Sequence, residues 1–98
     1  MSNFLDLPAS FLELMTAAAN IPPESSRYGQ IAGSIALLLS TIVYRQDAEL
    51  FRGLMREVGL SVPTDAAKRI LKTAQQGLDE DQRGWLQTQI DAILQGSE

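Results

Sequence analysis

The chain has 98 residues, 45% of them hydrophobic and 20% charged, so we expect residues 1–98 to form one globular domain with its own core. Cysteine and histidine are absent, which excludes disulfides and thiolate metal sites and removes the usual general base and the commonest metal ligand. The net charge of −4 argues against nucleic acid as a partner, because nonspecific binding depends on neutralising phosphates.

The first half of the chain predicts two helices. One begins at Leu7-Pro8, where proline suits a first-turn position, and ends at Asn20, before a pair of prolines. The other covers about 24–45; it is uncharged from Tyr28 to Tyr44 and has apolar residues on nearly every face. Such a helix is normally enclosed by other helices or lies in a membrane. The run is shorter than the roughly 20 apolar residues of a membrane-spanning helix, so we expect it at the centre of a bundle.

The next helix follows without an obvious break. Residues 24–58 form either one long helix or two, and a bend at 45–47 with Asp47 as N-cap agrees better with usual helix lengths. We expect this helix to end at Gly59 in a left-handed conformation, with Leu60 folding back onto Met55.

Two further helices complete the expected fold. A turn at 61–64 precedes a helix over 64–77, whose apolar residues follow the 3.6-residue period. Asp79 and Gln82 have the spacing of a capping box and predict the start of the last helix. Together these elements predict an all-α, single-domain bundle of four to five helices around the apolar helix at about 24–45. The buried face of the last helix is expected to contain Trp85, Leu86, Ile90, Ile93 and Leu94.

Small residues recur along one side of the helix at 24–45, at Gly29, Gly33, Ala36 and Ser40. Small side chains let two helix backbones approach closely. A glycine inside a helix costs about 1 kcal/mol relative to alanine, so two such glycines need a packing reason. This small-residue seam either packs on a neighbouring helix of the same chain or pairs with a second copy. The second alternative is the self-association hypothesis.

A second candidate surface combines arginine with aromatic residues around the third helix. This composition is enriched at protein contacts. The alternative is an ordinary solvated face with a pair such as Glu49–Arg52. The residues of the predicted partner-binding face are Tyr44, Arg45, Phe51, Arg52 and Arg56.

Residues 54–64 resemble the start of a helix-turn-helix, and the helix that follows carries Lys68, Arg69 and Lys72. The pattern departs from the motif at Asp65 and again at Lys68, where apolar residues should pack on the preceding helix. A DNA-binding regulator that uses helix 64–77 is therefore an alternative, with the acidic net charge against it.

Candidates for catalysis and metal binding are few. The acidic run Asp79-Glu80-Asp81 fits the start of a helix and lacks the alternating ligands of a calcium loop. No histidine is present to activate a serine, and no glycine-rich phosphate loop occurs. We expect no catalytic residue, no metal site and no cofactor.

These observations predict a non-enzymatic protein that acts through protein–protein contacts and forms homo-oligomers. An adaptor, a chaperone or an inhibitor of another protein, such as a phage encodes, fits this description. The first basic residue is Arg27, so the N-terminal region lacks the positive charge of a signal or transit peptide, and we expect a cytoplasmic protein. A further alternative is a small-ligand sponge that binds a nucleotide between subunits.

Overall fold

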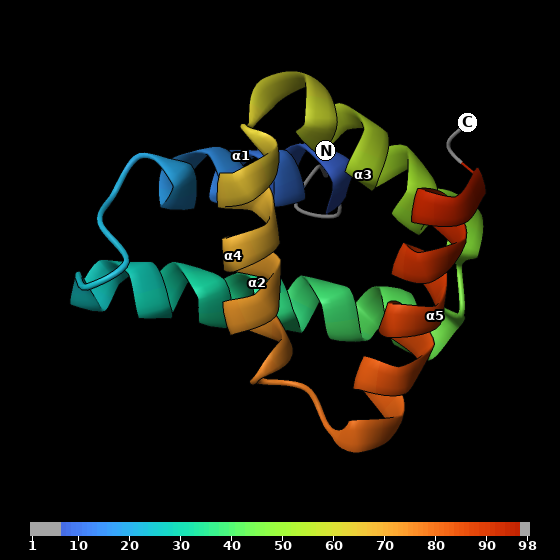
Figure 1. Cartoon of the computed structure of the whole chain (residues 1–98). Helices are drawn as coiled ribbons and strands as arrows, with labels where there is room; N and C mark the ends of the chain where they lie inside the picture. Colours follow the sequence, from blue (N-terminus) through green and yellow to red (C-terminus); the bar gives the residue numbers. More distant parts are fainter. Residues whose placement is uncertain (1–6, 97–98) are drawn as a thin grey trace, which may run out of the picture.

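The computed structural model describes residues 7–96, with side chains up to residue 93, and within that range the chain forms five α-helices and no strand. The all-α bundle predicted from the sequence is confirmed (Figure 1). The radius of gyration of 12.8 Å is that of a compact chain of this length, about 13 Å. The helices are α1 (Leu7–Ala19), α2 (Ser26–Arg45), α3 (Ala48–Ser61), α4 (Thr64–Gln75) and α5 (Glu80–Gly96).

The arrangement is organised by α2, which packs against each of the other four helices. α1 lies antiparallel to α2, and α4 crosses both of them at a steep angle (Figure 1). α5 lies near the C-terminal end of α2, whereas α3 begins there and runs back over α1 (Figure 1). By contrast, α4 and α5 share few contacts although they follow each other in the chain.

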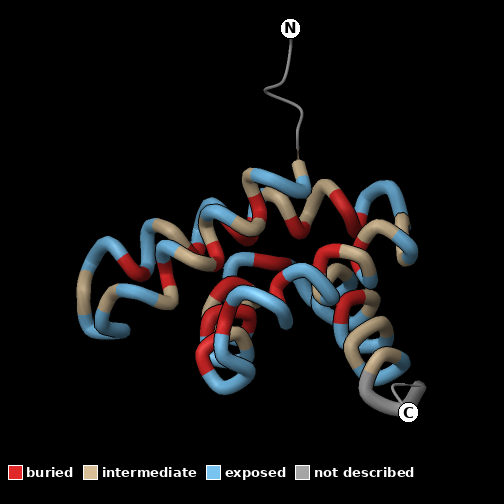
Figure 2. The backbone as a smooth tube through the Cα atoms, turned by 90° about the horizontal axis from the view of Figure 1, so that it is seen from above, coloured by how far each residue is buried: buried red, intermediate tan, exposed pale blue. Residues whose placement is uncertain are grey.

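The five helices share one hydrophobic core. Its largest side chains are completely or almost completely buried, and each such side chain stabilises the fold by about 1.5–3 kcal/mol relative to exposure. Buried positions face inward on all five helices (Figure 2). No charged or polar residue of the described part is buried, so apolar packing is the source of stability. The largest fully buried residues are Phe11, Phe51, Met15, Ile35, Leu39, Ile42, Ile70 and Leu86.

The segment 24–58 forms two helices, not one. α2 ends at Gln46, which has the left-handed conformation (φ 52°), and the Asp47 carboxylate accepts a hydrogen bond from the Leu50 N–H at 3.1 Å. The predicted N-cap role of Asp47 is therefore confirmed. An N-cap side chain satisfies one backbone donor that the first helical turn leaves free.

The predicted end of α3 is wrong. The helix continues through Gly59 to Ser61, and Leu60 is 79% exposed rather than folded back onto Met55. The helix ends where Val62 takes an extended conformation and buries its side chain to 4% exposure. Pro63 favours that conformation, because the residue before a proline avoids the helical region. Pro63 and the burial of Val62, and not glycine conformation, set the end of α3.

The predicted capping box at the start of α5 is confirmed. The Gln82 N–H donates to the Asp79 carboxylate at 2.8 Å, and the Asp79 N–H donates to the Gln82 side-chain oxygen at 3.0 Å. The Arg83 guanidinium also donates to the Leu78 carbonyl at 2.9 Å. These bonds satisfy backbone groups at the turn between α4 and α5 and fix the direction in which α5 leaves it.

The helix α2 is not enclosed as its composition suggested. Tyr28, Ile35 and Leu39 are buried, but the opposite side is open and Leu37 is 70% exposed. Among residues 7–96, no helix is long and apolar enough to cross a bilayer. One side of α2, the helix that is uncharged from Tyr28 to Tyr44, is therefore exposed.

Alanine substitutions at two glycines test the packing around the α4–α5 turn. Gly84 is exposed inside α5, and a Cβ built there meets no other atom within 4 Å. We expect Gly84→Ala to raise the free energy of unfolding by about 0.5–1 kcal/mol. A Cβ on Gly77 lies 3.1 Å from the Ala36 Cβ, and neither atom can rotate away. Gly77→Ala should therefore lower the free energy of unfolding by about 1 kcal/mol. Urea denaturation measures both, and a stabilising Gly77→Ala contradicts the close α2 contact.

Candidate protein-interaction surfaces

The exposed side of α2 is the first candidate surface. It carries no charged residue between Arg27 and Arg45. Leu37 is 70% and Tyr44 88% exposed, and they lie two helical turns apart on the same side of α2. The exposed positions in the middle of α2 recur at three- and four-residue intervals, so they lie along one side of the helix. We call this surface the α2 face; its residues are Gln30, Gly33, Ser34, Leu37, Thr41 and Tyr44.

The structure divides the predicted small-residue seam between two environments. Gly29 and Gly33 are exposed, with open space where a Cβ would stand. Ala36 is buried to 5% exposure and faces Gly77, so this part of the seam serves packing within the chain and is not accessible to a second copy. Ser40 is half-buried. The accessible surface is therefore rotated around the helix axis, from Ala36 toward Leu37.

The hydroxyl groups near the α2 face have partners in their own helix. Both Ser40 and Thr41 donate to the Leu37 carbonyl oxygen, at 2.9 and 3.2 Å. Covering this surface would leave neither hydroxyl without an acceptor, and a buried polar group without a partner costs about 1–3 kcal/mol. These two hydroxyl groups are therefore no obstacle to burial of the α2 face.

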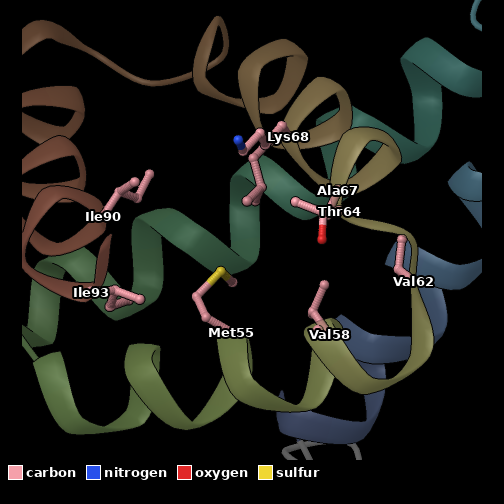
Figure 3. Close-up of a pocket in the computed structure, with 10 residues that line it drawn as sticks. Met55, Val58, Val62, Thr64, Ala67, Lys68, Ile90 and Ile93 are labelled. Atoms are coloured by element: carbon pink, nitrogen blue, oxygen red, sulfur yellow. The ribbon is translucent and has the colours of Figure 1, made fainter. Parts of the chain in front are cut away.

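The second candidate surface is a hollow of about 250 Å³ between α3, α4 and α5, open on one side (Figure 3). Met55 and Val58 rise into it from α3, and Ile90 and Ile93 face it from α5. We call it the groove. The remaining lining residues are Gly59, Val62, Thr64, Ala67, Lys68 and Leu71.

The groove exists because α4 and α5 diverge and because small residues line it. Gly59 on α3 leaves open space beyond its backbone, and Ala67 on α4 is only half-buried. The sequence reasoning missed this feature. Gly59 and Ala67 are small residues that indicate room for a hollow, but in the sequence Gly59 equally predicts the end of a helix. Recognising the hollow requires the relative directions of three helices.

The predicted partner-binding face is only partly a surface. Phe51 is completely buried and packs edge-on against Trp85, with ring centroids 6.4 Å apart. It therefore offers nothing to a partner, because its period places it on the core side of α3. Arg52 and Arg56 are exposed on α3, whereas Tyr44 and Arg45 belong to the end of α2. Within the described residues, the pair Glu49–Arg52 is not formed.

The three residues of the DNA-binding alternative, Lys68, Arg69 and Lys72, are all exposed on α4. Lys68 also lines the groove, with its amine directed toward the α5 side (Figure 3). Lys72 lies one turn further along the same side of α4. Lys68 therefore lines the groove, and Lys72 lies next to it on the same side of α4.

The acidic run at 79–81 begins α5. Asp79 accepts the capping hydrogen bond, and Glu80 and Asp81 lie in the first turn, where the helix dipole favours negative charge. In the part of the chain with described side chains, no three acidic residues gather as a metal site would require.

Comparison with protein-family models, curated proteins and solved structures gives no match to this chain.

Two methionines distinguish the groove from the core. Met15 is completely buried in α1, whereas Met55 is half-buried at the groove. We expect Met15→Ala to lower the free energy of unfolding by about 2–5 kcal/mol because it leaves a cavity. Met55→Ala should cost about 1 kcal/mol, since solvent already reaches the site. Denaturation of the two variants checks this; equal losses would mean that the groove is closed in solution.

Proposed function

We propose that this chain is a non-enzymatic protein that acts through protein–protein contacts, as an adaptor, chaperone or inhibitor of another protein, and that it associates with itself through the α2 face. The observation that carries the proposal is the uncharged, exposed side of α2 with Leu37 at its centre. A covered α2 face removes apolar side chains from water, which is the dominant favourable term in most protein association.

A second copy is the occupant that this surface fits best. In a two-fold symmetric dimer the same patch contacts itself, so a charged patch brings like charges together. The α2 face has no charge at its centre, because the flanking arginines, Arg27 and Arg45, lie at its two ends. Gly33 lies beside Leu37 and has no side chain, which lets another helix approach closely.

The size of the surface predicts weak association. A stripe from Gln30 to Tyr44 is about 21 Å long and about 10 Å wide, so a pair of stripes buries on the order of 400 Å². Standard stable interfaces bury about 1,200–2,000 Å². Unless neighbouring helices join the contact, we expect a dimer that forms only at high protein concentration.

Light scattering over a concentration series tests the proposal. We expect the apparent mass to rise from 10.7 kDa toward twice that value as concentration increases. Leu37→Arg should abolish the rise, because it places a charge at the centre of a contact that must be desolvated. Constant monomer mass up to the highest accessible concentration contradicts self-association.

The matched control is Leu60→Arg. Leu60 is 79% exposed, compared with 70% for Leu37, but it lies on α3, away from the α2 face. The same substitution at an equally exposed leucine should leave the concentration dependence unchanged. If both variants abolish association, a general effect of added charge explains the result and the α2 face is not the contact.

A further inference from the structure

Basic residues gather around the groove, although the chain as a whole is acidic. Lys68 lines the groove and Lys72 follows one turn later on α4. On α3, Arg52 and Arg56 precede Met55 and Gly59 by three residues, which places them along the outer edge of the lining residues. Four of the eight basic residues in a chain of net charge −4 thus border one apolar hollow. We call these four the basic rim.

The cations of the basic rim are available to a partner. All four are exposed, and within the described residues none makes a hydrogen bond or ion pair. The third edge of the groove, on α5, has the opposite character: Asp91 follows Ile90 and accepts a hydrogen bond from the Gln87 side chain at 3.0 Å. A ligand in the groove therefore meets Arg52 and Arg56 on the α3 side, and Lys68 and Lys72 together with Asp65, three residues before Lys68, on the α4 side. On the α5 side it meets the carboxylate of Asp91.

We propose that the groove binds an acidic amphipathic helix of another protein. Its apolar side chains would occupy the hollow between Met55, Val58 and Ile93, and its carboxylates would face the basic rim. Helix-in-groove recognition uses apolar anchors at helical spacing. The lining residues span 55–62 on α3 and 64–71 on α4, a length of about 10 Å or two helical turns. That length accommodates anchors at positions i, i+4 and i+7.

The geometry favours a protein segment over two other ligands. A small-molecule site typically has about 300–1,000 Å³ and buries most of its ligand, whereas this hollow has about 250 Å³ and is open on one side. DNA binding depends on phosphate contacts, and apolar side chains such as Met55 and Ile90 contribute nothing to them. Charge on the rim with an apolar floor matches a ligand that has both characters.

The test uses three synthetic helical peptides that differ only in charge. Each has leucine at i, i+4 and i+7, with glutamate, glutamine or lysine at the flanking positions. The peptides are titrated into the full isotope-labelled chain, and backbone amide chemical shifts are recorded by NMR. We expect the glutamate peptide to shift the amides of groove residues on α3, α4 and α5 in a saturable manner. Its Kd should be about tenfold lower than that of the glutamine peptide, and the lysine peptide should not saturate.

A pair of double variants makes the test specific. Arg56→Gln with Lys68→Gln removes two charges from the basic rim and should abolish the preference for the glutamate peptide. Arg27→Gln with Arg45→Gln removes the same charge from the ends of α2 and should preserve it. High salt should reduce the preference in the wild type, because exposed charges are screened. Equal effects of the two double variants would show that only net charge matters and overturn the proposal.

Other outcomes also overturn it. The proposal fails if no peptide shifts the groove amides, or if all three peptides bind with the same Kd. A saturable response to dodecanoate without a response to the peptides assigns the groove to a lipid, and a response to duplex DNA alone assigns the basic rim to nucleic acid. Failure here does not affect the self-association of the α2 face, which the light-scattering mass reports independently.

Discussion

The burial of one side of α2 is the constraint on which the rest of the structure depends. Each of the other helices packs against α2, and Ile35, Leu39 and Ile42 are completely buried by those contacts. Packed helices lie 8–10 Å apart, so about six neighbours are needed to enclose one helix. Residues 7–96 supply four, and two of these, α5 and the start of α3, lie near the same end of α2 (Figure 1). An exposed side of α2 follows from the number of helices alone.

The small number of helices also produces the groove. The turn after α4 brings Gly77 against Ala36 of α2, and the capping box of Asp79 and Gln82 then starts α5 in a fixed direction. α5 is held to the core by Leu86 and by the contact of Trp85 with Phe51. Those contacts draw α5 toward α3 and away from α4. The hollow between the two diverging helices is the consequence, and no further helix among residues 7–96 fills it.

Features determined by neighbours in the sequence were predictable. The break after α2 and the side-chain caps at Asp47 and Asp79 depend on residues within three positions of each other. Features determined by tertiary packing were not. Whether α3 stops at Gly59 or continues to Ser61 depends in part on the buried site that Val62 finds on other helices. Which alternative holds for the small-residue seam depends on Gly77, which is distant in sequence and lies against Ala36 but not against Gly29 or Gly33.

The candidate surfaces also combine features that neighbouring residues predict with features that only tertiary packing shows. Lys68 and Lys72 were singled out for DNA, and Arg52 and Arg56 for a protein partner, because the sequence presents them as two separate patterns. Only the fold shows that both sets border one apolar hollow.

The two surfaces have opposite electrostatic character, and this decides what each can bind. Two copies that met at their basic rims would bring four cations of one chain against four of the other, so the groove is unsuited to self-association. The α2 face has no charge to repel a second copy.

Glycine lies at both surfaces, Gly33 on the α2 face and Gly59 in the groove, and each leaves open space where a Cβ would stand. Neither has a positive φ or a close neighbour that requires glycine, and each costs the helix about 1 kcal/mol relative to alanine. The gain from these two glycines is surface shape: Gly33 leaves the side of α2 flatter, and Gly59 leaves the hollow wider.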